Sequence, residues 1–370
     1  MYTLTPGSSP QVPPREPVGR WERLRAIHAL TRQRAREGHL GVWRQLYEMV
    51  RLKLVHDIPA VHYHCAGMWR RDMPWAEKVG YVGGRQYVRA LAAANPLPYR
   101  KLSQHKLPEK ALLTLLGFPT PRFLGVVRRV GGRTASGAPL TTAAELEHFL
   151  ALHVGQRLSF KLMEGHGGFG FLAARVERGP DGCTLAPLAG EAPMSVGRFF
   201  AEHVERLPNG RLIEDYLEQH PTYAAFNESS VNTLRIVAYA PPDGRARVVG
   251  AYLRIGHAGS LVDNRTSGGI VAAVDQATGV VGVATDGAMT RELYRVHPDS
   301  GRPIEGVRLP FWAESLALAE AALDAFPKMR FAGLDVAVTP DGPSIIEINN
   351  YPGIEGLSSV NIRLASVLRP

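Results

Sequence analysis

The stretch GLDVAVTPDGPSIIEINN, residues 333–350, consists of two apolar segments separated by turn residues. Asp341 and Gly342 are typical of tight turns, so the pattern predicts a β-hairpin. Facing residues of a hairpin have numbers with a constant sum, and a turn centred on Asp341 pairs Asp335 with Glu347. Asn349, two residues beyond Glu347, is then expected on the same face. The opposite face is expected to hold Val336, Ile346 and Ile348.

Two facing carboxylates about 5 Å apart repel each other unless a cation lies between them. Carboxylate and amide oxygens suit Mg²⁺, or alternatively Mn²⁺, better than Zn²⁺. Asp335, Glu347 and Asn349 are therefore predicted metal ligands. The alternative is an edge hairpin whose acidic face is solvated, and the hairpin alone does not decide between the two.

The composition, 370 residues with 45 % hydrophobic, is typical of a globular enzyme. The formal charge of +9 is spread along the chain without runs of five or more like charges. It favours a phosphate-rich ligand at most, and we expect no nucleic-acid partner. Cys65 and Cys183 lack metal or redox spacing, and the chain shows no signal peptide or long apolar run. We therefore expect a cytoplasmic protein without a membrane partner.

The chain is predicted to have three parts. Residues 1–19 are rich in Pro, Ser and Gly and are predicted to be disordered. Residues 20–100 are predicted to be helical, with two amphipathic helices between 21 and 55 that break at Gly38-His39, and further helix near 75–95. Residues 101–370 alternate strands and helices, which indicates an α+β domain with antiparallel sheets. Its clearest elements are helices at 108–116 and 310–326 and strands at 122–127, 157–164 and 172–177.

Two histidines, His62 and His64, lie in the aromatic and basic stretch HYHCAGMWRRDMPW, residues 62–75. Imidazoles suit zinc, and aromatic side chains mixed with basic ones suit nucleic acid. A second ligand pair is missing from the sequence nearby, so a connector packed on helices is the better interpretation.

A second motif, FKLMEGHGGFGF at residues 160–171, places Lys161 on a predicted strand before a dense run of glycines. Glycines let backbone N–H groups approach an anion closely, and a lysine neutralises it. The order differs from a Walker loop, so the loop is expected to cover a phosphate as a flap between two strands. An ordinary glycine-rich turn is the alternative. The glycines are Gly165, Gly167, Gly168 and Gly170.

Several further polar residues lie beside apolar strands. Lys106 begins a predicted helix, although Lys110 and Arg100 nearby make a solvated basic face a sufficient explanation. An arginine inside an apolar strand, such as Arg235 in VNTLRIVAY, needs an anionic partner. The dense polar loop LRIGHAGSLVDNRTSGG, residues 253–269, is a candidate for holding a second substrate. The candidates in these stretches are Asn232, Arg235, Arg254, Asp263, Asn264, Arg265, Gly268 and Gly269.

Taken in order, these features resemble the ATP-grasp superfamily. The resemblance rests on an early lysine, a strand lysine with a glycine flap, a Glu-containing hinge in LIEDYLEQHP, and an Asp followed 12 residues later by Glu-x-Asn. More narrowly, residues 100–362 look like the sugar-transfer-associated ATP-grasp branch. The resemblance implies an α+β fold in which a small subdomain at about 155–220 and a large one at about 221–370 grip ATP between antiparallel sheets.

The resemblance also implies roles for individual residues. Lys106 and Lys161 would contact the phosphates of ATP, and the glycine loop would cover them. Arg235 or Arg254 would stabilise the transferring phosphoryl group, with Lys161, and Asp335, Glu347 and Asn349 would bind two Mg²⁺. The adenine would be held by Glu214, Asp215, Tyr216 and Leu217, and the ribose by Glu218 or His220.

The expected activity is that of an ADP-forming ligase, which joins a small-molecule carboxylate to an amine through an acylphosphate, in natural-product or polysaccharide metabolism. An alternative is a kinase acting on a hydroxyl, with His257 or Asp263 as general base. A third is a nucleotide-binding protein without turnover. The chain departs from the ligases at Gly333, where they often have arginine two residues before the metal Asp, and in lacking the usual preceding α/β domain. The predicted helices at 21–95 have enough apolar residues either to cover the active site or to form a dimer surface, so the sequence does not decide whether the protein is a homo-oligomer.

Overall fold

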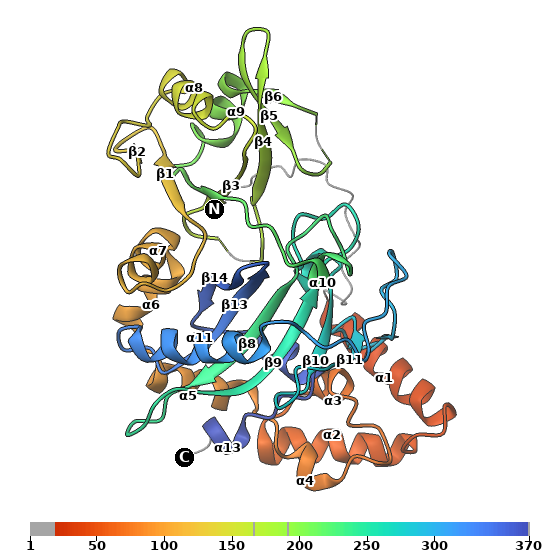
Figure 1. The fold of residues 1–370 in the computed structure, drawn as a ribbon. Coiled ribbons are helices and arrows are strands. Elements are labelled where there is room, and N and C mark those ends of the chain that lie inside the picture. The colour runs from red at the N-terminus through yellow and green to blue at the C-terminus, as the bar shows by residue number, and fades with distance from the viewer. Residues whose placement is uncertain (1–18, 166, 191, 369–370) are drawn as a thin grey trace.

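The computed structural model describes residues 19–165, 167–190 and 192–368. The predicted disordered tail, apart from Gly19, lies outside the described residues. The described chain forms two seven-stranded sheets, here called sheet A and sheet B, and a group of helices (Figure 1). Antiparallel sheets with interspersed helices confirm the α+β fold class.

Sheet A has the strand order β2-β1-β7-β3-β4-β5-β6, with antiparallel neighbours throughout. Helices α8 (Ala143–Ala151) and α9 (Val196–His203) cover one face. The sheet also contains two strands upstream of residue 155, because β1 pairs with β7. Its strands are β1 (Phe123–Val127), β2 (Arg133–Thr134), β3 (Arg157–Leu162), β4 (Leu172–Gly179), β5 (Gly182–Pro187), β6 (Met194–Ser195) and β7 (Arg211–Asp215).

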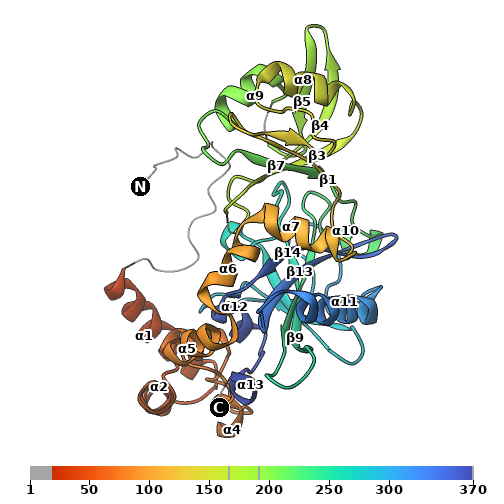
Figure 2. The same cartoon turned by 90° about the vertical axis from the view of Figure 1, so that its left-hand side faces the viewer.

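Strand β3 shows how sheet A presents its second face. Leu158 and Phe160 point into the core under α8 and α9. Because side chains alternate along a strand, Ser159 and Lys161 point to the other side. That side faces sheet B, which lies below sheet A in Figure 2.

Sheet B has the strand order β12-β11-β10-β9-β8-β13-β14, again antiparallel. Its strands are β8 (Thr233–Tyr239), β9 (Arg247–Ile255), β10 (Ile270–Val274), β11 (Val281–Thr285), β12 (Leu293–Tyr294), β13 (Phe331–Thr339) and β14 (Gly342–Asn349). A short helix, α10 (Pro221–Ala224), follows β7, and a 3₁₀ turn, η1 (Arg265–Ser267), precedes β10.

Helices cover the two faces of sheet B unequally. Helix α11 (Trp312–Ala325) packs on one face, against residues such as Ile236 and Leu334. The other face packs Val237 and Phe331 against α5 (Gly84–Ala94), α12 (Ile354–Ser359) and α13 (Ala365–Leu368). These helices cover only one end of that face, and the other end remains open toward sheet A.

The N-terminal helices form a layer at the end of the molecule opposite to sheet A (Figures 1 and 2). The predicted pair is α1 (Arg20–Arg36) and α2 (Val42–His56), and Gly38, with a φ of +86°, ends the first helix where the break was expected. Their own core contains Met49, Leu52 and Tyr63. Helices α3 (Ala60–Cys65) and α4 (Trp75–Lys78) belong to this layer, whereas α6 (Leu97–Gln104) and α7 (Lys106–Leu115) lead from it toward sheet A (Figure 2).

The β13–β14 hairpin has the predicted pairing for a different reason than expected. Asp335 faces Glu347, as the sequence predicted, but Thr339 pairs with Gly342, so the turn is the two-residue Pro340-Asp341. A β-bulge between Asp335 and Val336 adds one residue on β14 and moves the register by one. The bulge also corrects the assignment of faces. Ile345 enters the core, and Ile346, predicted on the core side, lines a cleft instead.

No helix in the described parts of the chain is long and apolar enough to cross a membrane.

Candidate functional site

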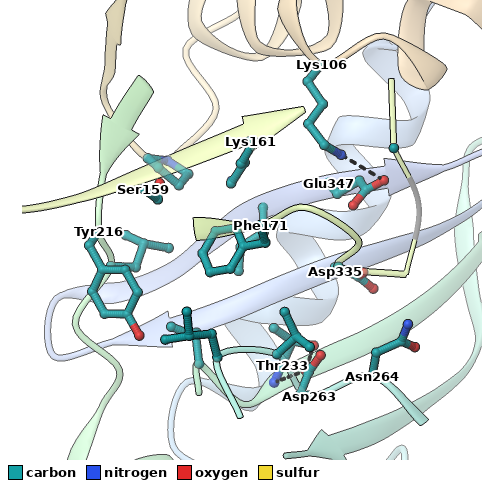
Figure 3. A pocket seen from close by; sticks show the side chains of 18 of the residues that line it. Lys106, Ser159, Lys161, Phe171, Tyr216, Thr233, Asp263, Asn264, Asp335 and Glu347 are labelled. Atoms are coloured by element: carbon teal, nitrogen blue, oxygen red, sulfur yellow. Dashed lines mark hydrogen bonds and ion pairs between the residues drawn. The ribbon is translucent and has the colours of Figure 1, made fainter. Parts of the chain in front are cut away.

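A cleft with an empty volume of about 950 Å³ lies between the uncovered faces of the two sheets (Figure 3). Sheet A contributes Ser159 and Lys161, and sheet B contributes Asp335 and Glu347. A cleft at the junction of two layers is a typical place for a ligand. The predicted site residues that line it are Lys106, Lys161, Gly165, Gly168, Asp215, Tyr216, Leu217, Arg254, Asp263, Asn264, Asp335 and Glu347.

The sheet A wall is built on a buried carboxylate between two lysines, which we call the lysine clamp. Glu214 lies 2.6 Å from the Nζ of Lys110 and 2.5 Å from that of Lys161. Burial alone would raise the pKa of Glu214, but the two lysine charges lower it below its ordinary value. One acid and two cations leave a net positive charge, and of the three only Lys161 lines the cleft.

The clamp corrects two expectations from the sequence. Glu214 was predicted to hold adenine, but its side chain is fully buried and fixes Lys161. Lys110, for which a solvated face seemed sufficient, is also buried and bonds the carbonyl of Pro121 at 3.0 Å. Burial lowers the pKa of Lys110, against the attraction of Glu214.

The sheet B wall is a network of carboxylates and arginines, which we call the arginine network. Asp335 accepts hydrogen bonds from Nη2 of Arg235 at 2.9 Å and from Nη1 of Arg254 at 2.9 Å. Burial would raise the pKa of Asp335, but the two guanidinium groups lower it. The facing carboxylates were expected to repel each other unless a cation was present, and in this structure the guanidinium groups of Arg235 and Arg254 neutralise Asp335.

Arg235 and Gly333 are linked by packing. Arg235 faces Asp335 across β8 and β13, and Gly333 lies two residues before Asp335. A Cβ on Gly333 would come within 2.9 Å of the Cδ of Arg235. A side chain at 333 is therefore excluded, and Arg235 supplies a guanidinium from the neighbouring strand instead. Arg235 does not line the cleft, whereas Arg254 does.

Arg254 extends the network to a second acid. Its Nη2 lies 2.8 Å from Oδ1 of Asp263, whose Oδ2 accepts the backbone N–H of Thr233 at 3.0 Å. Burial raises the pKa of Asp263 despite the adjacent Arg254 charge. Thr233 also donates its hydroxyl to Asp263, as Figure 3 shows. Both carboxylate oxygens of Asp263 are thus occupied.

Glu347 and Lys106 meet at the mouth of the cleft, at 3.2 Å (Figure 3). Burial would lower the pKa of Lys106, but Glu347 raises it. The backbone N–H of Lys106 bonds the carbonyl of Met163, which ties α7 to the end of β3. The Glu347 side chain keeps 26 % exposure, so it can bind a ligand from the cleft.

The predicted metal ligands fit a hard divalent cation in donor chemistry. Asp335 and Glu347 are register partners that both line the cleft, and Nδ2 of Asn349 lies 3.5 Å from Oδ2 of Asp335. Two carboxylates and an amide are the oxygen donors that Mg²⁺ accepts. Among the described residues no group of three or more His, Cys, Asp or Glu side chains is arranged for a metal. Both carboxylate oxygens of Asp335 already accept hydrogen bonds from arginine, and Asn349 does not line the cleft, so a cation held by these residues would have to replace arginine contacts of Asp335.

The chain after β7 forms the far wall of the cleft. Asp215, Tyr216 and Leu217 line it, and Arg157 lies over the Tyr216 ring at 5.6 Å. His220 does not line the cleft, because its side chain caps α10 through the N–H of Thr222. Glu218 pairs with Arg157 and is largely exposed. Three of the residues predicted from the resemblance to hold adenine, Asp215, Tyr216 and Leu217, thus line the cleft, whereas neither predicted ribose contact does.

The glycine loop bends over the cleft and meets sheet B. Gly168 has a φ of +72°, and a Cβ there would lie 2.6 Å from Cγ1 of Val262. Phe169 and Phe171 from the same loop line the cleft. Gly165 and Gly168 also line it, whereas Gly167 and Gly170 do not. The close approach to Val262 therefore needs a glycine at position 168, and it places the loop at one side of the cleft.

Four predicted substrate residues lie outside the cleft. Asn232 is fully buried and bonds backbone carbonyls of Tyr223 and Asn227, so its role is to hold the chain before β8. Arg265 donates to the carbonyl of Gly287 at 3.4 Å. A Cβ on Gly269 would lie 2.4 Å from the carbonyl oxygen of Asp263, which makes this glycine a packing requirement, and Gly268 has a φ of +94°. Asp263 and Asn264 are the part of the predicted loop that reaches the cleft.

Some residues of the cleft were missed from the sequence. Ser159 could have been found, since it lies two residues before Lys161 on the same strand face. Thr233 could have been found in the same way, since it begins β8 two residues before Arg235, whereas Val262 lies in the loop after β9 and gave no such signal. Glu109, buried beside Lys106 and Glu347, was also missed, and burial raises its pKa well above the ordinary value.

The two histidines of the stretch 62–75 make contacts with neighbouring parts of the protein. His64 is fully buried and lies 3.4 Å from the hydroxyl of Thr31, and burial lowers its pKa to about 4. His62 lies 3.6 Å from Glu355. The two histidines pack α3 against its neighbours, in agreement with the interpretation favoured from the sequence.

Comparison with known proteins gives one family and a set of distant structures. Residues 94–367 match the model of the family described as sugar-transfer associated ATP-grasp. No curated protein sequence matches the chain significantly.

Three of the similar experimental structures illustrate the identities, TM-scores and coverages of these matches. An N5-carboxyaminoimidazole synthase from Aspergillus clavatus, in complex with ADP and 5-aminoimidazole ribonucleotide, is 12 % identical with a TM-score of 0.40, covering 76 % of this chain and 57 % of its own. The D-cycloserine synthetase DcsG is 14 % identical with a TM-score of 0.43 and coverages of 75 % and 74 %. The D-alanyl-alanine synthetase A of Vibrio cholerae is 13 % identical, with a TM-score of 0.37 and coverages of 72 % and 60 %.

The chain spans 52 % of the length of the first of these similar structures, an N5-carboxyaminoimidazole ribonucleotide synthetase in an ADP complex. At these identities the similarity concerns the fold alone.

Proposed function

The chain belongs to the sugar-transfer associated ATP-grasp family, and from this premise we propose that it is an ATP- and magnesium-dependent ligase that joins a carboxylate to an amine through an acylphosphate. The observation that supports this most directly is the opposition of two charged walls in one cleft. A lysine wall faces a wall of carboxylates and arginines. Such a pair of walls suits a metal–triphosphate, whose anionic and cationic parts need opposite partners.

In this proposal the nucleotide lies along the cleft. Tyr216 and Leu217 would hold the adenine, with Phe171 beside it. Lys161 and Lys106 would neutralise the phosphates, and the loop containing Gly168 would cover them and exclude water. Glu214 and Lys110 position Lys161 without touching the nucleotide, since both are buried.

Asp335, Glu347 and Asn349 would hold Mg²⁺, which when bound supplies charge neutralisation at the transferring phosphoryl group. Lys106 would then exchange its contact with Glu347 for a phosphate oxygen, because both lie at the same edge of the cleft. Mn²⁺ has similar ligand preferences and would substitute.

Arg254 would stabilise the transferring phosphoryl group. Its two carboxylate partners, Asp263 and Asp335, hold the guanidinium in the cleft. The acceptor carboxylate would attack the γ-phosphorus as the bond to the β-phosphate oxygen breaks, and ADP leaves. An amine would then attack the acyl carbon and release phosphate and a proton. Positioning and charge stabilisation account for such a reaction without a protein nucleophile.

The kinase alternative needs a general base, and the geometry favours it less. His257 does not line the cleft, and its Nδ1 lies 2.9 Å from the carbonyl of Ala258. Asp263 lines the cleft, but Arg254 and Thr233 occupy both of its oxygens. A ligase, whose first acceptor is an ionised carboxylate, needs no such base.

The proposal is tested by offering the protein ATP, Mg²⁺ and hydroxylamine, with pools of small carboxylates in one series and pools of sugars and polyols in another. A ligase yields ADP, phosphate and a hydroxamate with a carboxylate, because hydroxylamine captures the acylphosphate. A kinase yields ADP and a phosphorylated acceptor with a sugar or polyol, without free phosphate or hydroxamate. ATP binding with no acceptor-dependent ADP in either series would contradict both activities and favour a binding protein. Metal dependence follows from repeating the assay with EDTA and with Mn²⁺.

A further inference from the structure

The outward face of helix α2 is apolar. Trp43, Tyr47, Val50 and Leu54, here called the apolar ridge, are 84 %, 53 %, 57 % and 80 % exposed. Their spacings of four, three and four residues place them on one stripe of the helix. The opposite stripe packs inward through Gln45, Glu48, Met49 and Leu52. Because the helix already buries one face, a second apolar stripe needs an explanation other than the core of this chain.

Basic residues surround the apolar ridge. Residues 20–56 contain nine Arg and Lys against three Asp and Glu, a net charge of +6 out of the formal +9 of the whole chain. Arg44 and Arg51 flank the ridge on one side and Lys53 on the other. Helix α1 packs beside α2, with the amide of Gln45 bonded to the carbonyl of Thr31 at 3.1 Å. Its exposed basic side chains are Arg20, Arg23, Arg25, Arg32 and Arg36.

Charge and chemistry together select the occupant of this face. A second copy of the chain would bring another +6 against the first, which is repulsive. Nucleic acid would need basic side chains along the ridge itself, where Trp, Tyr, Val and Leu lie. An apolar ridge with tryptophan and tyrosine, bordered by arginine and lysine, is instead the pattern of helices that lie in a membrane interface.

We propose that the apolar ridge and the basic residues of α1 and α2 dock this protein on an anionic lipid surface. The ridge would enter the boundary between headgroups and acyl chains, and the arginines would pair with anionic headgroups. Helix α2 lies at the end of the molecule opposite to sheet A in both views (Figures 1 and 2), so docking leaves sheet A away from the lipid. This proposal is independent of the reaction catalysed in the cleft.

The experiment is flotation of the full chain with vesicles of phosphatidylcholine, with or without phosphatidylglycerol. We expect partitioning to vesicles that contain phosphatidylglycerol, and its loss as NaCl rises, because salt screens the attraction. The variant W43S/L54S is expected to reduce partitioning about ten-fold or more. Its matched control is L152S/L293S, which removes two side chains that are 69 % and 62 % exposed elsewhere.

A second pair of variants distinguishes the effect of basic residues near the ridge from the effect of the net charge of the chain. R25Q/R32Q on α1 is expected to weaken binding several-fold, because each basic residue near the surface contributes measurably. R129Q/R178Q, in the turn after β1 and on β4, makes the same change in net charge and is expected to leave binding unchanged. Circular dichroism checks the fold of each variant.

Three outcomes would overturn the proposal. The first is no preference for phosphatidylglycerol vesicles, and the second is unchanged partitioning of W43S/L54S. The third is a dimer, seen by light scattering, that W43S/L54S dissociates while vesicles fail to bind. That result would assign the ridge to contact between copies.

Discussion

The two walls of the cleft solve the same electrostatic problem in different ways. On sheet A one carboxylate, Glu214, lies between two lysines, and on sheet B the carboxylates Asp335 and Asp263 are joined by Arg254. The lysine clamp has a net positive charge, whereas in the arginine network the two carboxylates Asp263 and Asp335 balance the two arginines Arg235 and Arg254. Glu347 beside the network is paired with Lys106. The clamp therefore suits an anion, and the sheet B wall has a surplus of carboxylate only when Lys106 leaves Glu347.

The largest expected effect on the difference between the two walls comes from replacing Glu214. Glu214→Gln leaves Lys110 and Lys161 buried without a counter-charge, so we expect a loss of about 3–5 kcal/mol in the free energy of unfolding. Urea denaturation measures it. The control is Glu218→Gln, since Glu218 is 73 % exposed in its pair with Arg157 and is expected to change stability by less than about 1 kcal/mol. Equal effects of the two changes would contradict a buried clamp.

The loss of stability in the same variant is expected to depend on pH. The folded pKa of Glu214 is below its ordinary value, so its charge stabilises the fold above the unfolded pKa of about 4.3 and loses this effect as the pH falls through the folded pKa. We expect the stability difference between wild type and Glu214→Gln to narrow below about pH 4.3. A difference that widens on acidification would refute the lowered pKa.

On the opposite wall, Glu347→Gln tests the carboxylate proposed to hold the metal. We expect ATP turnover to fall by about 10²–10³-fold, because an interaction that stabilises the transferring charge is lost. Melting temperature should fall less than for Glu214→Gln, since the side chains of Glu347 and Lys106 keep 26 % and 16 % exposure, whereas that of Glu214 keeps 1 %. Asp341→Asn, in the turn of the same hairpin, is the control. Turnover retained by Glu347→Gln would sink the metal assignment.

The contact between the two walls is tested at Gly168. Gly168→Ala places a Cβ against Val262 at a φ of +72°, so we expect a cost of about 1–2 kcal/mol and a rise of about five- to thirty-fold in the KM for ATP. Gly137→Ala has a similar φ of +88° but open space around it, and is expected to leave the KM unchanged. A KM change shared by both variants would mean that strain, not the contact with Val262, is responsible.

Sequence reasoning found the hairpin because its information is local. The spacing of Asp335 and Glu347, with turn residues between them, was enough to place them opposite each other. The predicted register nevertheless depended on two errors that cancel, a turn centre that lies between Pro340 and Asp341 rather than on Asp341, and an unforeseen bulge. A bulge is set by how the strand fits its neighbours, which the two segments alone do not reveal.

The surface of α2 shows a similar limit. The sequence showed no run of five or more like charges and no long apolar run, and the expectation was therefore no membrane partner. Residues 20–56 nevertheless carry +6 of the formal +9. Only the packing of α1 and α2 shows which apolar side chains of this stretch are buried and which remain exposed as a ridge. Whether that region contacts lipid is the question posed by the flotation experiment.

The sequence by itself determined the α+β class, the order of lysine, glycine loop and acidic hairpin, and most of the residues that line the cleft, because strand periodicity and turn chemistry act over a few residues. The tertiary structure decided which of the charged residues pair. Glu214 became a support for Lys161, and Lys110 became part of a buried clamp rather than a solvated face. Asp335 found arginines on β8 and β9, some 100 and 81 residues away. Such pairs depend on which strands become neighbours in a sheet and on how far burial strengthens the attraction between the paired charges. Neither can be predicted from the residues next to each charge in the sequence.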